Sequence, residues 1–276
     1  GSVNRPAAGV LPATFWAAAR VARTRLLALD FDGTLAPFVV DPAAARPLPA
    51  ARRALDRIVA NGGTELAILT GRPAAEAAAL LAPLALPIAG EHGWERRLAD
   101  GTAHVHPVTS AQSTALAAAE RVVAALAPAR GERKRTALVI HTRGLEPATA
   151  EAIHAAARRE LAAWTVDGSF SLRPIDGGLE LRLTGRDKGT ALGELVASSG
   201  EGTFVVAVGD DETDEDAFRV ARRLGGWAIG VGRRPDSVAQ ASLTGPDAVA
   251  AFLAEWAERL GTTALAGAAG GERRAG

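Results

Sequence analysis

Short apolar runs alternate along the chain with longer segments that suit helices, the pattern of parallel strands covered by helices on both faces. The apolar runs predict strands at Leu26–Asp30, Glu65–Leu69, Pro87–Ala89, Phe204–Val208 and Trp227–Val231. The intervening segments predict helices at Ala50–Asn61, Ala74–Ala82, Lys188–Ser198, Asp214–Leu224 and Pro246–Leu260. We therefore predict an α/β fold with a parallel sheet flanked by helices.

The alternation is interrupted between Pro107 and Thr184. The pattern there predicts a helix at Ser110–Leu126, a strand at Ala137–His141, a helix at Pro147–Ala163, and strands at Ser171–Ile175 and Gly178–Leu183. Strand-helix alternation resumes afterwards. We therefore predict a discontinuous core, residues 1–106 and 185–262, with an inserted domain at 107–184 and a flexible tail at 263–276.

Composition narrows the classes of partner. The 276 residues include 31 basic and 31 acidic ones, a balance that does not favour nucleic acid or anionic membranes as partners. The absence of cysteine excludes disulfides, thiolate zinc sites and cysteine nucleophiles. The longest weakly polar stretch, Ala77–Gly90, is too short to span a bilayer. No secretory signal is apparent, and we expect a cytoplasmic monomer without nucleic-acid or membrane partners.

The stretch LLALDFDGTLAP, Leu26 to Pro37, ends an apolar run with Asp30 and Asp32. Ligands of an open parallel sheet bind beyond the carboxyl ends of its strands, where these aspartates are expected. Two carboxylates so close repel each other, and Mg2+, a hard cation that prefers oxygen ligands, would offset that repulsion. The alternative is an aspartate-rich turn without a function.

A second acidic stretch, VVAVGDDETDEDAF, repeats this design, with Asp210, Asp211 and Asp214 after an apolar run. A structural alternative is an acidic first turn of the following helix, which the helix dipole favours. That alternative accounts well for Glu212 and Glu215 but poorly for Asp210. The repeated design therefore strengthens the functional interpretation of both stretches.

The end of another predicted strand and the start of another predicted helix carry groups that suit phosphate. Thr70, Gly71 and Arg72 follow a predicted strand and place a hydroxyl and backbone N–H groups at a helix start, which is a ready anion site. Lys188 stands at the start of another helix, where the alternative is a solvated surface lysine. Because the net charge is zero, an anionic ligand has to be met locally by such groups.

In this order the groups resemble the four motifs of the haloacid dehalogenase (HAD) superfamily of phosphatases: Asp30-x-Asp32-Gly33-Thr34, Thr70-Gly71-Arg72, Lys188, and Gly209-Asp210-Asp211-x-x-Asp214. The resemblance implies a Rossmann-like HAD core with a parallel sheet and an inserted α/β cap domain of the C2B type. It also implies that Asp30 is the nucleophile that forms an aspartyl-phosphate, and that Asp32 is the general acid and base.

The resemblance further implies Mg2+ as the cofactor. Its ligands would be the Asp30 carboxylate, the Asp32 backbone carbonyl and Asp210, with support from Asp214 and Asp211. The phosphoryl group would be held by Asp30, Gly33, Thr70, Gly71, Arg72 and Lys188. Thr70 and Lys188 would also act in catalysis, by holding the phosphoryl oxygens and, for Lys188, offsetting the growing charge.

Within the superfamily, three stretches resemble the trehalose-6-phosphate phosphatase family. AGEHGWERR matches at His92 and Gly93, ERKRTALVIHTR at Glu132, Lys134, His141 and Arg143, and GGLELRL at Glu180. Polar groups of this kind suit sugar hydroxyls, which both donate and accept hydrogen bonds. Singly, each residue has a structural alternative: a turn histidine, solvated surface charges, or a glutamate paired with Arg182 or Arg173.

The main hypothesis from the resemblance is Mg2+-dependent hydrolysis of trehalose 6-phosphate to trehalose and phosphate, with a separate synthase supplying the substrate. One alternative is a phosphatase for a related sugar or pseudo-disaccharide phosphate, such as a validoxylamine-type or sucrose phosphate. It follows from Thr142, which stands where the family commonly has an aromatic. A second alternative is a catalytically silent sugar-phosphate-binding regulatory module, and a third is a phosphomutase.

Overall fold

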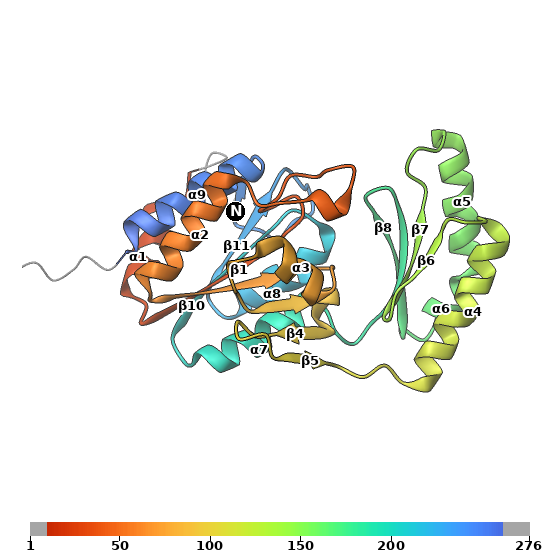
Figure 1. Ribbon diagram of the computed structural model, residues 1–276, viewed down its shortest axis with the longest axis horizontal. Helices are drawn as coiled ribbons and strands as arrows, with labels where there is room; N and C mark the ends of the chain where they lie inside the picture. The colour runs from red at the N-terminus through yellow and green to blue at the C-terminus, as the bar shows by residue number, and fades with distance from the viewer. Residues whose placement is uncertain (1–9, 262–276) are drawn as a thin grey trace, which may run out of the picture.

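The structure, a computed structural model, describes residues 10–261, which form two parts, each built on its own β-sheet (Figure 1). An eight-stranded sheet with helices on both faces forms the core, and a four-stranded antiparallel sheet with helices on one face forms what we call the cap. The α/β fold class predicted from the sequence is confirmed. The expected tail at 263–276 lies outside the described residues. Within residues 10–261, no helix has the length and apolar character needed to cross a membrane.

The core sheet has the order β12-β11-β10-β1-β2-β3-β4-β5. Its strands are β1 (Thr24–Leu29), β2 (Thr64–Leu69), β3 (Ile88–Gly90), β4 (Glu95–Arg97), β5 (Ala103–Val105), β10 (Thr203–Gly209), β11 (Trp227–Val231) and β12 (Ala241–Leu243). The strands from β12 to β3 are parallel, and β4 and β5 extend the sheet by antiparallel pairing. Leu29 of β1 pairs with Val208 of β10 and Ile68 of β2, so these three strands end level with one another.

Side-chain alternation along the strands explains why helices cover both faces of the core sheet. Leu27 of β1 faces one hydrophobic cluster and Leu26 faces the other. The first cluster contains α1 (Ala13–Val21), α2 (Pro49–Asn61), α3 (Ala74–Leu81) and α9 (Pro246–Arg259), and the second contains α7 (Lys188–Ser199) and α8 (Glu215–Arg223). Three short 3-10 turns are η1 (Pro42–Ala44), η2 (Glu91–Gly93) and η3 (Glu212–Asp214). The sequence pattern does not reveal α1, which packs Phe15 against Trp256 of α9.

The cap sheet has the order β6-β7-β9-β8, with neighbouring strands antiparallel. Its elements are α4 (Ser110–Leu126), β6 (Gly131–Arg133), β7 (Ala137–His141), α5 (Pro147–Glu160), α6 (Ala162–Thr165), β8 (Phe170–Ile175) and β9 (Gly178–Leu183). The helices cover one face, and the other, which we call the open face, is turned toward the core (Figure 1). The expected single helix Pro147–Ala163 is two helices, because the backbone at Leu161 departs from helical geometry.

Candidate active site

Three aspartate side chains meet at the carboxyl ends of β1 and β10. Asp30 follows β1, Asp210 follows β10, and Asp214 ends η3. One carboxylate oxygen of each lies within 4.8 Å of the others. Two glycines allow this approach: a Cβ at Gly33, which has φ 79°, would lie 2.2 Å from an Asp210 oxygen, and one at Gly209 would lie 2.2 Å from Asp214 Cγ. The two acidic stretches of the sequence thus form one cluster.

Lys188 is the counter-ion of this cluster. It is the first residue of α7, whose N-terminus is capped by Asp187, and its side chain is only 3% exposed. Nζ donates to Asp30 Oδ1 at 2.8 Å and to Asp214 Oδ1 at 2.7 Å. The alternative of a solvated surface lysine is therefore wrong. The full sequence has only two lysines, Lys134 and Lys188, and both are predicted site residues.

One lysine does not balance three buried carboxylates. Burial raises the pKa of Asp30 and of Asp214 to about 7, and repulsion between carboxylates adds to the effect. Burial likewise raises the pKa of Asp210 to about 6. Burial alone would lower the pKa of Lys188, but the attraction of Asp214 and Asp30 outweighs it and the pKa rises. With all three carboxylates ionised, the cluster keeps two uncompensated negative charges, which suits a divalent cation.

Asp211 stands at the start of η3, outside the three clustered carboxylates. Its N–H donates to Asp214 Oδ2 at 3.0 Å, and its own Oδ2 accepts from the Thr213 hydroxyl at 3.2 Å. Asp211 and Asp214 form a reciprocal capping box, which restrains the Asp214 side chain. Asp211 therefore orients one of the clustered carboxylates.

Asp32 has a different partner. Its two carboxylate oxygens accept from Arg72, at 2.7 Å from Nε and 2.7 Å from Nη2, which makes a bidentate pair. The hydrogen bond to Asp32 raises the pKa of Arg72. Arg72 also pairs with Glu76 and lies over the Phe31 ring, 5.6 Å from its centroid. The expected phosphate ligand Arg72 thus orients the expected general acid, and its contact with phosphate stays a prediction.

Hydroxyl groups of two threonines complete the core side of the site. Thr34 Oγ1 lies 3.3 Å from Asp30 Oδ2 and 3.3 Å from Asp210 Oδ1, so it joins the two strand ends. Thr70 is buried beyond the end of β2, and its Oγ1 accepts from the N–H of Arg72 at 3.1 Å. The predicted site includes Thr70 but not Thr34, although Thr34 stands in the same short motif as Asp30 and Asp32, which follow β1.

The open face of the cap sheet presents Glu180, which is 6% exposed. Its Oε1 lies 3.7 Å from Nε2 of His92 and 4.0 Å from Nη1 of Arg182. The His92 ring rests on Gly71, where a Cβ would lie 2.6 Å from Nε2. Burial, followed by the charge of Arg182, lowers the pKa of His92 well below its usual value, so this imidazole is neutral. The predicted sugar residue Glu180 thus meets the predicted phosphate segment through His92.

Two other predicted residues lie near this contact. Lys134, in the turn between β6 and β7, is close enough for its positive charge to act on His92 and Glu180. Gly93, with φ 99°, packs on the backbone carbonyl of Asp187, where a Cβ would lie 2.5 Å from the oxygen. A steric requirement therefore explains Gly93, and its contact with substrate stays a prediction.

Glu132, His141 and Arg143 form ion pairs of their own. Glu132 and His141 lie on the open face of the cap sheet, with 2.6 Å between Oε2 and Nε2. Arg143 donates to Asp176 at 2.6 Å, and the two side chains are 64% and 65% exposed. The structure does not bring these three residues into contact with the His92 and Glu180 pair, and their binding of a sugar stays a prediction.

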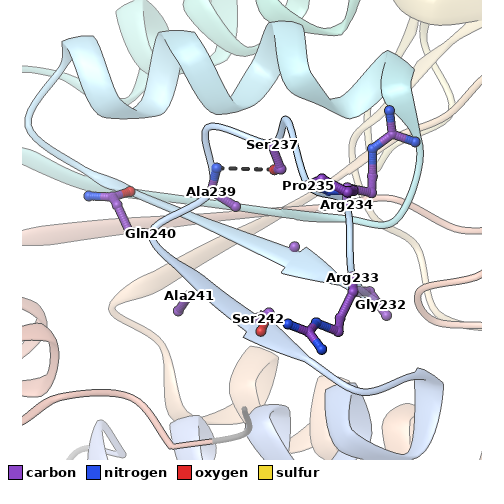
Figure 2. Close-up of a pocket in the computed structure, with 11 residues that line it drawn as sticks. Gly232, Arg233, Arg234, Pro235, Ser237, Ala239, Gln240, Ala241 and Ser242 are labelled. Carbon is purple, nitrogen blue, oxygen red and sulfur yellow. Dashed lines mark hydrogen bonds between the residues drawn. The ribbon is translucent and has the colours of Figure 1, made fainter. Parts of the chain in front are cut away.

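A separate cavity of about 430 Å3 lies beyond β11 and β12 (Figure 2). The loop from Gly232 to Ala239 and the adjoining strand residues line it, and Figure 2 shows Arg233 and Ser242 among the lining residues. None of the predicted site residues is among its lining residues. The cavity is therefore not part of the candidate active site.

The chemical groups and their places in the fold define a class of protein. Carboxylates follow β1 and β10, a hydroxyl follows β2, and a buried lysine begins α7, all at one edge of a parallel sheet that faces a cap. This is the architecture of a HAD-superfamily phosphatase. A model of the trehalose-phosphatase family matches residues 28–246. The chain belongs to the trehalose-phosphatase family, whose members are phosphoric monoester hydrolases.

Individual relatives agree with this assignment. The chain is 32% identical over 230 residues to a probable trehalose-phosphate phosphatase of Sinorhizobium fredii, covering 83% of this chain and 86% of that protein. It is 37% identical over 216 residues to a trehalose-phosphate phosphatase of Mycolicibacterium paratuberculosis, covering 73% of this chain but 52% of that longer protein. The C-terminal domain of the Candida albicans trehalose-6-phosphate phosphatase has the same fold, with a TM-score of 0.80 at 22% identity over 92% of this chain and 99% of that one.

Proposed function

We propose that this protein hydrolyses trehalose 6-phosphate to trehalose and inorganic phosphate, with Asp30 as nucleophile and Mg2+ as cofactor. The observation that carries the proposal is the buried contact of Lys188 with Asp30 and Asp214. This contact places a carboxylate nucleophile, an oxygen-rich cation site and a positive charge for the phosphoryl group at the same strand ends. Family membership supports trehalose 6-phosphate as the substrate, and the geometry of the site supports hydrolysis with Asp30 as nucleophile.

The proposed reaction consists of two displacements at phosphorus. In the first, an Asp30 carboxylate oxygen forms a bond to phosphorus while the bond from phosphorus to the sugar oxygen breaks, and Asp32 gives that oxygen a proton. In the second, a water molecule attacks phosphorus, Asp32 takes a proton from the water, and the bond to Asp30 breaks to release phosphate. Asp32 therefore ends the cycle protonated, as it began.

The surrounding residues have binding and orienting roles in this proposal. Lys188 and Thr70 hold the phosphoryl oxygens, and the Lys188 ammonium offsets the negative charge that builds on them. Arg72 holds the Asp32 carboxylate by two hydrogen bonds and so orients it, and Asp32 releases one of these bonds when it takes up the proton that it gives to the sugar oxygen. The sugar lies between the core and the open face of the cap sheet. Its contacts there are Gly93, His92, Lys134 and Glu180, with Glu132, His141 and Arg143 beyond them.

The clustered residues fit a divalent cation. Three carboxylates face the single charge of Lys188, and a ligand set made only of oxygen atoms suits Mg2+. Asp30, Asp210 and Asp214 would hold the ion together with the Asp32 backbone carbonyl. When bound, Mg2+ withdraws charge from the phosphoryl oxygens and lessens their repulsion of the nucleophile.

Mg2+ is expected to stabilise the fold more at pH 8 than at pH 5. The pKa values of Asp30, Asp214 and Asp210, about 7, 7 and 6, lie above the usual 3.8. The metal-free folded protein therefore binds protons that the unfolded chain has lost, and its stability falls as the pH rises through this range. Because Mg2+ competes with these protons, excess Mg2+ should raise Tm by about 4 °C or more over EDTA at pH 8, and by about 1 °C or less at pH 5. Equal shifts at both pH values would contradict the proposed site, and Asp210→Asn should remove the shift.

Phosphate release from a panel of esters tests the substrate. We expect trehalose 6-phosphate to have the highest kcat/KM, with sucrose 6-phosphate and glucose 6-phosphate lower by about 10-fold or more. Faster release from a pseudo-disaccharide phosphate would favour the alternative suggested by Thr142. The structure weakens that alternative, because Thr142 is buried and its hydroxyl lies 3.0 Å from His154 Nε2 of α5, on the helical side of the cap.

The same panel tests the other two hypotheses. A silent regulatory module would bind one of the esters, as measured by calorimetry, and release no phosphate from any of them. A phosphomutase would move phosphate between positions on the sugar and likewise release none. We expect one free phosphate ion for each ester molecule that is consumed. Of the three hypotheses, only a phosphatase produces this outcome.

A further inference from the structure

The turn η2, between β3 and β4, has an unusual backbone conformation. Glu91, His92 and Gly93 have φ values of 47°, 54° and 99°, and the left-handed region is unfavourable for residues other than glycine. Such a conformation persists where surrounding contacts impose it, and it is common at functional sites. The contacts of this turn come from both the core and the cap.

On its core side the turn is bonded to the predicted phosphate segment. The N–H of Glu91 donates to the Arg72 carbonyl at 2.9 Å, and the N–H of His92 donates to the Thr70 carbonyl at 3.0 Å. The His92 ring covers Gly71, where a Cβ would lie 2.6 Å from Nε2. A displacement of the turn therefore displaces residues 70–72 with it.

On its other side the turn continues into the hydrophobic core of the cap. Trp94 directly follows the turn, is 7% exposed, and packs in the cluster that holds Leu116 of α4, Leu138 of β7 and Leu181 of β9. Its backbone carbonyl accepts from the N–H of His106, which follows β5 in the linker that leads to α4. A movement of the cap is therefore transmitted to the turn through Trp94.

Arg135, in the turn between β6 and β7 of the cap, bonds to η2, to Trp94 and to the linker. Its Nη2 donates to Glu91 Oε2 at 2.9 Å and to the Trp94 carbonyl at 3.3 Å. Its Nη1 donates to the His106 carbonyl at 2.8 Å. One guanidinium thus holds the turn, the tryptophan and the linker in fixed relation, a geometry for which its planar fork of donors is suited.

We propose that Arg135 is a positioning residue that couples the position of the cap to the phosphate segment, residues 70–72, through η2. The inference rests on the proposed phosphatase function and deepens it. A sugar phosphate that draws the cap onto the core tightens the grip of residues 70–72 on the phosphoryl group. A small phosphate ester that does not reach the cap gains nothing from this coupling.

Kinetics of Arg135→Gln with two substrates test the coupling. We expect kcat/KM to fall by about 10-fold or more for trehalose 6-phosphate, and by about 2-fold or less for p-nitrophenyl phosphate. Arg158→Gln is the matched control, because Arg158 lies on α5, on the helical side of the cap, and pairs with Glu151 of the same helix. A double variant with Glu91→Gln should lose no more than Arg135→Gln alone, since Glu91→Gln breaks a contact that Arg135→Gln has already broken. Equal losses on both substrates would reduce Arg135 to a structural role.

Amide hydrogen exchange gives a readout that does not depend on the sugar. The N–H groups of Glu91 and His92 should exchange about 10-fold faster in Arg135→Gln than in the wild type, and at the wild-type rate in Arg158→Gln. Unchanged exchange in Arg135→Gln would overturn the coupling even if the enzyme is active. If the wild type hydrolyses neither substrate, the proposed function fails instead, and the exchange result still decides whether Arg135 holds the turn.

Discussion

Asp30→Asn is expected to lower kcat for phosphate release by at least about 10,000-fold, because an amide does not attack phosphorus. The same change is expected to stabilise the metal-free fold at pH 8. Asp30 is 6% exposed and its carboxylate faces those of Asp210 and Asp214, so removing its charge removes repulsion. The amide carbonyl that the substitution leaves would still accept from Lys188. A substitution that lowers activity and raises stability identifies a residue that serves catalysis at a cost in stability.

Phosphate release and thermal unfolding in EDTA, measured on the same preparations, check this prediction. Asp56→Asn is the matched control, because Asp56 lies on α2 with its side chain 54% exposed and pairs with Arg52, one turn away on the same helix. The control should change neither quantity. An Asp30→Asn enzyme that keeps more than about 1% of wild-type kcat would refute the role of Asp30 as nucleophile. A lower Tm for this variant at pH 8 would refute the explanation that repulsion between Asp30 and the other two carboxylates destabilises the metal-free fold.

Lys188→Met is expected to cost both activity and stability. It removes the only positive charge bonded to Asp30 and Asp214 in the described part of the chain, and breaking a buried pair by removing one partner typically costs about 3 kcal/mol. The cost should be largest near pH 8. In the variant the pKa of each aspartate lies higher still, so both are protonated as the pH falls and the repulsion disappears.

Denaturant unfolding of Lys188→Met at pH 5.5 and pH 8 in EDTA measures this dependence. The variant should be destabilised by about 3 kcal/mol at pH 8 and by clearly less at pH 5.5, and Mg2+ should recover part of the loss at pH 8. The kcat for phosphate release should fall by about 1,000-fold, because the phosphoryl oxygens lose a fixed positive charge. A cost that is the same at both pH values would contradict the charge explanation.

Long elements follow from the sequence because each carries its own signals. Ser110–Leu126 begins with a capping box at Thr109 and Gln112, and Gly178–Leu183 alternates leucines with charged residues at the period of a strand, so both predicted ranges agree with the structure. Three-residue strands such as β4, β5, β6 and β12 are too short to show a period of two. They form because the strand beside each of them offers unpaired backbone N–H and carbonyl groups at the edge of the sheet.

Part of the candidate site likewise follows from the sequence, and part of it does not. The order of short motifs was enough to name Asp30, Asp210 and Lys188, because each motif stands where a strand ends or a helix begins, and the parallel sheet brings those ends to one edge. No local pattern shows which group a long side chain will meet. Arg72 was predicted to face phosphate, and in the structure its guanidinium is bonded to Asp32.

By itself, the sequence determined the fold class, the acidic strand ends and the family, since local hydrophobic patterns and short motifs are properties of the chain. Only the tertiary structure decided that Lys188 is buried between two carboxylates, that Glu180 of the cap meets His92 of the core, and that Arg135 holds the turn between them. These contacts join residues 26 to 158 positions apart in the chain. Burial, charge balance and pKa depend on such distances in space, which the order of residues does not express.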